Sequence, residues 1–289
     1  GLLLNSKIQG AKKMYKIMKR IFMTLVVTCI CMTTCITGVD AVLLKAVTDE
    51  VLYVDFEGQV DDQSGNGNNG TLVGSPDFVS GIKGKAIHIK NAGSAATQYV
   101  NFGKPTDLQF GEGNFSYSLW YNSAGSDDDM ILGNKDWYSG ANRGWGIATF
   151  SDGVRTNIAT SARVDAKKIL VNDQEWHHIA VNYDREGNMA VYVDGVQTKS
   201  ESIKHLTGTG DALDVVLGAD GNKKFALAEA SIDELRIFKR VMSVDEIGEQ
   251  YMDDVLPYLR KIHASQFAQI KDNQAFDNDA KQAYKVLVD

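Results

Sequence analysis

The sequence predicts an all-β protein, a sandwich or barrel of antiparallel strands followed by a helical segment. Three observations support this prediction. Between about residues 50 and 240, short segments rich in Val, Ile, Tyr and Phe alternate with Gly, Asn and Asp. No stretch of that region has helical periodicity. From residue 243 the composition changes to Ala, Gln, Asp, Lys and Leu, with apolar residues at helical spacing.

The first 41 residues have the pattern of a secretory signal peptide with an upstream extension. Basic "KKMYKIMKR" (12–20) precedes apolar "IFMTLVVTCICMTTCI" (21–36), and Val39 and Ala41 occupy the −3 and −1 positions of a cleavage site. We therefore expect an exported protein, secreted or on the cell surface. The alternative is a signal anchor that stays in the membrane, but the apolar run is short and rich in Thr for a span.

This leader also contains all three cysteines, Cys29, Cys31 and Cys35. Its removal leaves no thiol for a disulfide framework, a thiolate metal site or a cysteine nucleophile. The formal net charge of the whole chain is −7, and removal of the basic leader makes the remainder more acidic. An acidic protein is a poor partner for nucleic acid or an anionic membrane surface. Cations and neutral glycans are compatible with this charge, and no membrane insertion is expected after cleavage.

The expected strands follow one another at short intervals. They are EVLYVDFEG, KAIHIK, QYVNFG, FSYSLWYN, DMILGNK, GWGIATF, HHIAVNYD, MAVYVDG, DVVLGAD and IDELRIF. "REGN" (185–188) and "VDGV" (193–196) predict hairpin turns, and the second contains an Asp-Gly pair that tolerates positive φ. Short strands at this spacing indicate a sandwich or barrel, which we assign to residues 48–242.

The helical segment, 243–289, opens with "SVDEIGEQY". Ser243 and Glu246 have the spacing of a capping box, in which each side chain binds the backbone N–H of the other residue. The apolar spacing beyond predicts two or three helices, with Pro257 near the start of one. Because the chain begins with Gly and the helical pattern still runs at Asp289, we expect a fragment of a longer polypeptide, whose next module begins in this segment.

"EWHHIAVNYDREGNMAVYVDGV" (175–196) is the most specific stretch of the chain. Its Trp-His-His strand, Tyr-Asp turn and Tyr-Val-Asp-Gly hairpin resemble LamG-like jelly-roll domains of the concanavalin A-like lectin/glucanase superfamily. "LYVDFEGQVDDQSGNGNNGTLVG", "GNFSYSLWYN" and "ASIDELRIFKRVMSVDEI" resemble the opening strand and loop, an internal strand and the closing strand of these domains. The resemblance covers about residues 50–247 in family order and does not extend to 248–289.

This resemblance implies a jelly-roll β-sandwich of two antiparallel sheets, with the first and last strands adjacent. It also implies an accessory role in exported glycan-active or adhesive proteins. Many such domains bind carbohydrate or protein, and many hold structural calcium.

The loop "DDQSGNGNNGTLVG" (61–74) is rich in turn-forming and oxygen-bearing side chains. Calcium takes about six to eight oxygen ligands. Asp62 and Asn66 lie in this loop, Glu57 precedes it, and Asp233 lies on the closing strand, which the resemblance places beside the opening one. We expect these four residues and loop carbonyls to hold a structural calcium ion. The alternative is that Gly and Asn serve turn geometry alone and the acids are solvated.

A second segment, "NKDWYSGANRGWGI" (134–147), combines aromatic rings with hydrogen-bonding side chains. Sugars present apolar C–H faces to aromatic rings, and their hydroxyl groups need paired donors and acceptors. The expected glycan site consists of Asp136, Trp137, Tyr138, Asn142 and Arg143.

The remaining tryptophan and histidine candidates are expected to be structural. Trp145 begins a strand between two glycines and should pack inward, and Trp120 and Trp176 should anchor the core. His177 and His178 are adjacent on a strand, so their side chains point to opposite faces and are poorly placed to hold one zinc ion.

Catalysis is not expected. Glycoside hydrolases of the same superfamily place two Glu and an Asp on one strand, and a retaining enzyme needs two carboxyl groups about 5 Å apart. "EASIDE" (229–234) comes nearest but has the wrong spacing, and the sequence lacks nucleophile-elbow, Walker and Rossmann motifs. The prediction is an exported, non-catalytic, calcium-stabilised module that binds a glycan. The alternatives are an adhesion or structural module that binds a protein and, less favoured, a glycoside hydrolase.

Overall fold

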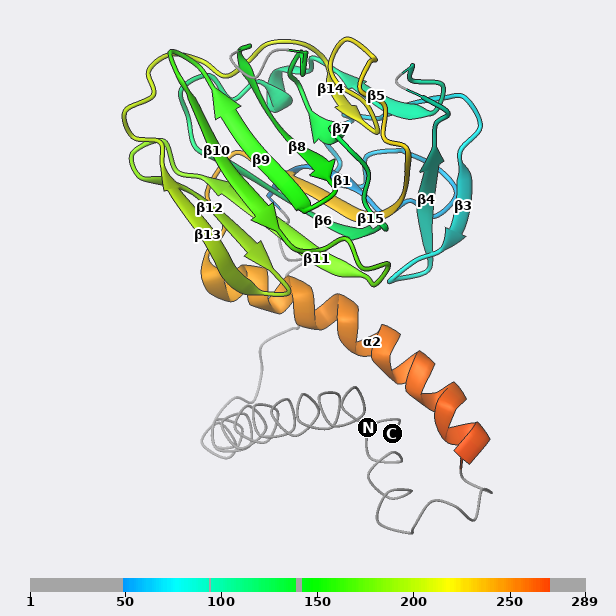
Figure 1. Ribbon diagram of the computed structural model, residues 1–289. Helices are drawn as coiled ribbons and strands as arrows, with labels where there is room; N and C mark the ends of the chain where they lie inside the picture. The colour runs from blue at the N-terminus through cyan, green and yellow to red at the C-terminus, as the bar shows by residue number, and fades with distance from the viewer. Residues whose placement is uncertain (1–48, 94, 139–141, 271–289) are drawn as a thin grey trace, which may run out of the picture. The chain divides into compact units, whose positions relative to one another are not determined.

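The computed structural model describes residues 49–93, 95–138 and 142–270 (Figure 1). The expected signal peptide, 1–41, and the segment 271–289 lie outside the described residues. The described part folds as the predicted β-sandwich of two antiparallel sheets, followed by one helix. Within these ranges, no helix has both the length and the apolar character needed to span a membrane.

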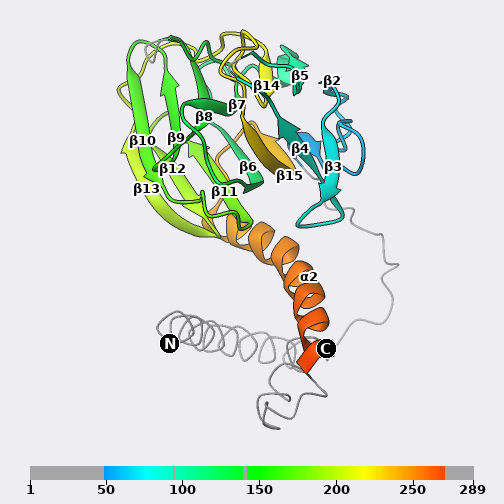
Figure 2. The same cartoon turned by 45° about the vertical axis from the view of Figure 1, so that its right-hand side comes forward.

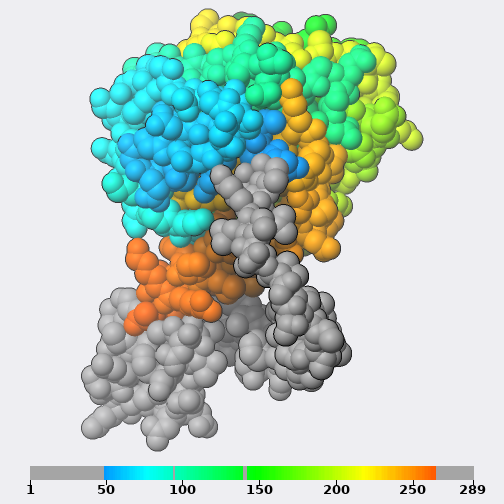
Figure 3. All heavy atoms as spheres, turned by 180° about the vertical axis from the view of Figure 1, so that it is seen from behind, coloured from blue at the N-terminus to red at the C-terminus, as the bar shows by residue number. Residues whose placement is uncertain are grey.

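The larger sheet, here called sheet A, has eight strands. They are β1 (Glu50–Val54), β3 (Asp77–Ser80), β4 (Lys85–Lys90), β6 (Phe115–Asn122), β11 (His177–Tyr183), β12 (Asn188–Val193), β13 (Val196–Ser202) and β15 (Glu229–Phe238). Seven of them lie in the order β13-β12-β11-β6-β15-β4-β3. The eighth strand, β1, pairs with β15 and is not part of this linear order. The opening and closing strands are therefore neighbours, as the resemblance implies, and Leu52 pairs with Ile237. Figure 3 shows the first strands, in blue, beside the closing strand, in orange.

The smaller sheet, here called sheet B, has seven strands. They are β2 (Thr71–Val73), β5 (Tyr99–Gly103), β7 (Asp129–Gly133), β8 (Gly144–Phe150), β9 (Gly153–Ala159), β10 (Arg163–Ile169) and β14 (Val215–Leu217). Their order is β10-β9-β8-β7-β14-β5-β2. A short 3-10 helix, η1 (Thr106–Leu108), follows β5. The sequence patterns do not predict β2, β3, β9, β10 or β13.

The main core lies between the two sheets and includes a group of stacked aromatic rings. Phe115 of β6 stacks on Tyr183 of β11 with ring centroids 4.2 Å apart, and Trp145 of β8 lies 5.6 Å from Tyr117. Trp145 is fully buried, as predicted. The hydroxyl of Thr156 lies 3.1 Å from that of Tyr117 and 2.8 Å from that of Tyr183, so these polar groups have partners inside the core.

Both predicted hairpin turns are present. Residues 184–187 connect β11 to β12, and the backbone N–H of Gly187 donates to the carbonyl of Asp184 at 2.9 Å. Asp194 and Gly195 connect β12 to β13 with φ values of 52° and 77°. Two consecutive positive φ angles are typical of a two-residue hairpin turn, which explains the Asp-Gly pair.

One continuous helix, α2 (Val244–Ile270), follows the sandwich. The predicted capping box is present, because the Ser243 N–H donates to Glu246 Oε2 at 2.7 Å and the Glu246 N–H donates to Ser243 Oγ at 3.1 Å. Contrary to the prediction, Pro257 does not lie near a helix start but inside α2, which is the one helix in the described part of this segment. An internal proline removes one backbone hydrogen bond, and contacts of the preceding turns with sheet A offset this loss.

These contacts lie on the outer face of sheet A (Figure 2). Trp120 Nε1 donates to Asp254 Oδ2 at 3.0 Å, and the Trp120 ring lies 5.7 Å from that of Tyr251. His178 lies beside Trp120, and only 1% of its surface is exposed. Trp120 is therefore buried, as expected, but beneath α2 rather than between the sheets.

Candidate functional site

The expected glycan residues lie in the segment that connects β7 to β8. Tyr138 is 83% exposed, Arg143 is exposed, and Asp136 and Asn142 are half-buried. Asn142 Nδ2 donates to the Asp136 carbonyl at 3.1 Å, and Asp136 Oδ1 accepts the Tyr138 N–H at 3.0 Å. The structure thus links Asp136, Tyr138 and Asn142 by hydrogen bonds, with Arg143 next to them in the chain.

Trp137 has a different environment from Tyr138. Only 5% of its surface is exposed, and its ring packs against Met130 and Ala148 on the outer face of sheet B. Trp137 Nε1 donates to Asp128 Oδ1 at 2.7 Å. The ring is therefore not accessible to a sugar in this structure, and Trp137 supports the segment that presents Tyr138.

The outer face of sheet B continues this site with side chains that sequence reasoning missed. Gly146 of β8, Asn157 of β9 and Asp165 of β10 are neighbours across the strands. Lys135, which precedes β8, donates through its Nζ to Asn157 Oδ1 at 3.2 Å. Asp165 Oδ1 accepts hydrogen bonds from Arg163 Nε at 3.0 Å and Nη2 at 2.5 Å. These contacts fix a polar row beside the Tyr138 segment.

Lys135 is an internal support of this row. It is fully buried, and Asn157 beside it is also fully buried. Burial of the ammonium group and the nearby Arg163 charge lower the pKa of Lys135 to about 8. Lys135 therefore positions Asn157 rather than meeting a ligand from solvent.

The signal that could have located this row is an alternation of apolar and polar residues. In β9, Val154, Thr156 and Ile158 point into the sandwich, whereas Arg155 and Asn157 point outward. That period of two is typical of a half-buried strand.

Two of the expected calcium ligands, Asp62 and Asn66, make hydrogen bonds that hold the loop 61–74 in place. The Asp62 carboxylate accepts the backbone N–H groups of Tyr53 at 3.1 Å, Ser64 at 2.9 Å and Asn68 at 3.0 Å. Burial raises the pKa of Asp62, but hydrogen bonds from Ser64 and the backbone outweigh it, and the net pKa is lowered. Asn66 Nδ2 donates to the Glu50 carbonyl at 2.8 Å. Internal hydrogen bonds therefore account for the conformation of this loop.

The other two expected ligands, Glu57 and Asp233, accept backbone hydrogen bonds at or next to the turn 81–84. Glu57 Oε1 accepts the Lys85 N–H at 2.9 Å, and Asp233 Oδ2 accepts the Lys83 N–H at 3.2 Å. Asp233 is fully buried, and this burial raises its pKa to about 8. The four expected ligands thus separate into two pairs with different backbone partners. Across the described ranges, no group of three or more His, Cys, Asp or Glu side chains is arranged to hold a metal ion.

The acids of "EASIDE" lie in separate environments. Glu229 is exposed and pairs with Lys90 at 2.9 Å. Asp233 and Glu234 are buried, and the Glu234 carboxylate binds Tyr53 and Arg236. These acids therefore do not form the open pair of carboxylates that glycoside hydrolysis uses.

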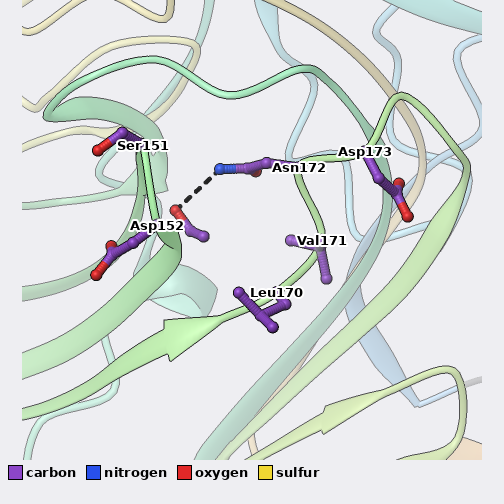
Figure 4. A pocket seen from close by; sticks show the side chains of 7 residues that line it. Ser151, Asp152, Leu170, Val171, Asn172 and Asp173 are labelled. Atoms are coloured by element: carbon purple, nitrogen blue, oxygen red, sulfur yellow. Dashed lines mark hydrogen bonds between the residues drawn. The ribbon is translucent and has the colours of Figure 1, made fainter.

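A shallow pocket of about 260 Å³ lies between the β8–β9 turn and the β10–β11 loop (Figure 4). Its lining consists of Ser151, Asp152, Gly153, Leu170, Val171, Asn172 and Asp173. Asn172 Nδ2 donates to the carbonyls of Phe150 at 2.6 Å and Gly153 at 3.1 Å, so this side chain holds the turn in place. The volume is below the range of about 300–1,000 Å³ that is typical of small-molecule sites.

The family model described as the concanavalin A-like lectin/glucanases superfamily matches residues 93–248, more than half of the chain. The chain belongs to this superfamily. A comparison with curated proteins gives no match.

Solved structures with a similar fold include toxin binding domains and a domain of an arabinanase. The binding domain of Paraclostridial Mosquitocidal Protein 1 superposes with a TM-score of 0.60 and 17% identity, over 72% of this chain and 52% of that one. The ligand-binding domain of botulinum neurotoxin serotype D, in complex with N-acetylneuraminic acid, gives 0.54 and 15%, over 71% and 51%. Domain 4 of AbnA, a GH43 extracellular arabinanase from Geobacillus stearothermophilus, in complex with arabinotriose, gives 0.55 and 20%, over 70% and 97%. The chain spans about half the length of the toxin domains and nearly all of the arabinanase domain.

Proposed function

We propose that this chain is an exported, non-catalytic carbohydrate-binding module whose ligand lies on the outer face of sheet B, beside the segment that connects β7 to β8. One observation carries the proposal: an exposed aromatic ring, Tyr138, stands beside polar side chains that hydrogen bonds hold in place. The arabinotriose and N-acetylneuraminic acid complexes of domains with a similar fold support it.

The chemistry of this face suits a sugar. The Tyr138 ring offers an apolar surface to the C–H groups of a pyranose or furanose ring. Asp136 accepts hydrogen bonds from hydroxyl groups, Arg143 donates them, and Asn142 can do both. The Asn142 side chain is held by the Asp136 carbonyl and the Asp136 carboxylate by the Tyr138 N–H, so these two side chains lose little entropy when a ligand binds.

The exposed apolar residues favour a glycan over an adhesive protein contact. The large hydrophobic side chains that the described residues expose are Leu72, Tyr138, Leu170, Val196 and Val244. They lie on β2, the β7–β8 segment, the β10–β11 loop, β13 and α2, which are five different elements. Scattered single hydrophobic residues are normal on a protein surface, whereas a docking site needs a contiguous patch.

A glycan array probed with the purified protein tests this proposal. The wild type should retain at least one oligosaccharide, and Tyr138→Ala should lower affinity about tenfold because the stacking contact is lost. Val196→Ala is the matched control, since Val196 is also exposed but lies on β13. Retention of no glycan, or equal loss in both variants, would contradict the proposal.

Calcium is a second part of the proposal, restricted to the turn 81–84. The Glu57 and Asp233 carboxylates contact this turn from two separate elements, and a buried carboxylate gains from a nearby cation. Backbone carbonyls and water would have to complete the coordination, which calcium accepts. The ion would stabilise the junction of the opening and closing strands and would take no part in ligand chemistry.

A further inference from the structure

Arg155, on β9 of the outer face of sheet B, makes no hydrogen bond through its guanidinium to another described residue, and its Nε is buried. Its neighbour Arg163 donates to Asp165 through both Nε and Nη2. Arg155 Nε is buried without a hydrogen-bond partner, and the nearest carboxylate atom, Asp165 Oδ1, is 4.0 Å away. This distance is beyond a hydrogen bond.

One oxygen of Asp165 is already engaged by other donors. Its Oδ1 accepts both bonds from Arg163 and a further contact from Asn157 Nδ2 at 3.4 Å. One carboxylate thus faces two guanidinium groups, and the buried Lys135 ammonium lies behind them. Arg155, Arg163 and Lys135 therefore bring three cationic groups near Asp165, with Asp136 as the other acid beside Lys135.

The Arg155 guanidinium is also held in a fixed orientation. Its central carbon lies 4.1 Å from the centroid of the Phe150 ring, which covers one side of the planar group. The side chain is 25% exposed, so its remaining N–H groups can be reached from the outer face. A stacked guanidinium keeps its fork of donors and matches two oxygens of a carboxylate or sulfate.

We propose that Arg155 is an anion-recognition residue and that the ligand of this face is an acidic glycan, whose carboxylate or sulfate group pairs with the Arg155 guanidinium. The inference rests on the proposed glycan binding and names its substrate class. A neutral glycan would leave Arg155 without an acceptor, whereas an acidic sugar unit on the Phe150 side of the row would supply one. The ionic contact also makes affinity dependent on salt.

Titration calorimetry with three oligosaccharides of equal length tests this inference: a galacturonate, a sulfated galactan and a neutral galactan. The wild type should bind one acidic ligand at least about tenfold more tightly than the neutral one. Arg155→Gln should remove that difference, because the variant loses affinity for the acidic ligand far more than for the neutral one. Arg155→Lys should keep only part of it, because lysine retains the charge but not the planar fork. The stronger acidic ligand identifies carboxylate or sulfate as the partner.

Arg260→Gln is the matched control, because it removes the same charge from an exposed position on α2. Thermal unfolding of each variant shows whether it is folded. If Arg155→Gln does not fold, the affinities of Arg155→Lys are compared with those of the wild type instead. Equal wild-type affinity for acidic and neutral ligands, or equal losses on both in Arg155→Gln, would overturn acid recognition but leave glycan binding intact. Absence of binding to all three ligands and to the glycan array would overturn both.

Discussion

Trp137 and Tyr138 are adjacent in sequence but have opposite environments. Trp137 is 5% exposed and donates to Asp128, whereas Tyr138 is 83% exposed. The sequence groups the two rings because both are aromatic and lie in a Gly-rich segment. Which ring is buried depends on Met130 of β7 and Ala148 of β8, whose positions follow only from the folded sheet.

This difference predicts opposite results for two alanine variants. Trp137→Ala should lower the free energy of unfolding by about 3 kcal/mol or more, because it opens a cavity and removes a hydrogen bond. Tyr138→Ala should change it by less than about 0.5 kcal/mol. Urea denaturation measures both. Similar stability losses in the two variants would contradict the assignment of support to Trp137 and ligand contact to Tyr138.

His177 makes the stability of the β12–β13 turn dependent on pH. Its Nδ1 lies 2.9 Å from Asp194 Oδ2 and its Nε2 lies 3.1 Å from Asp173 Oδ1. The hydrogen bond to Asp194 raises the pKa of His177, burial opposes this, and Asp173 adds to the increase. A raised folded-state pKa means that the contribution is fully present below the unfolded pKa of about 6.5 and is lost as pH rises through the folded pKa.

The stability difference between wild type and His177→Gln should therefore be larger at about pH 5.5 than at about pH 8.5. Urea denaturation at the two pH values measures this difference. His205→Gln serves as a control for the loss of an exposed histidine. A difference that is constant or grows with pH would show that the two ion pairs do not form.

At the scale of elements, strands that alternate strongly could be predicted and strands without an apolar face could not. β6 directs Phe115, Tyr117 and Leu119 into the core, so its sequence alternates. All seven residues of β13 are exposed, and no burial pattern marks them as a strand. β13 forms because β12 offers an edge for backbone hydrogen bonds, which sequence periodicity does not detect.

The calcium proposal belongs to the turn 81–84 and makes a prediction at that scale. If calcium binds there, saturation at about a hundred times its dissociation constant should stabilise the protein by about 2.7 kcal/mol. Thermal unfolding with calcium and with excess chelator measures the shift. Glu57→Gln should abolish the calcium-dependent shift. Asp62→Asn should retain the shift, because the hydrogen bonds of Asp62 lie within the loop 61–74 and β1 rather than at the turn 81–84. No shift with calcium, or loss of the shift in Asp62→Asn alone, would contradict this location.

At the scale of the whole molecule, the prediction of a two-sheet sandwich is confirmed, whereas the predicted site residues stay a prediction. Period-two patterns, turn residues and the superfamily motifs depend on local chemistry, and the capping box of α2 follows from four residues. Pro257 was expected near a helix start but lies inside α2, whose preceding turns contact Trp120 on sheet A. Arg155, Asn157 and Asp165 were missed because β9 and β10 must pair before these side chains share a face.

The central claim is that a glycan binds the outer face of sheet B. Backbone amide chemical shifts, recorded by NMR while the best array ligand is added, test it most directly. We predict perturbations concentrated at residues 136–138, 142–143 and 155–165, with Arg155 and Tyr138 among the largest. Perturbations confined to the turn 81–84, to β13 or to α2 would contradict the claim, and so would the absence of any change at saturating ligand.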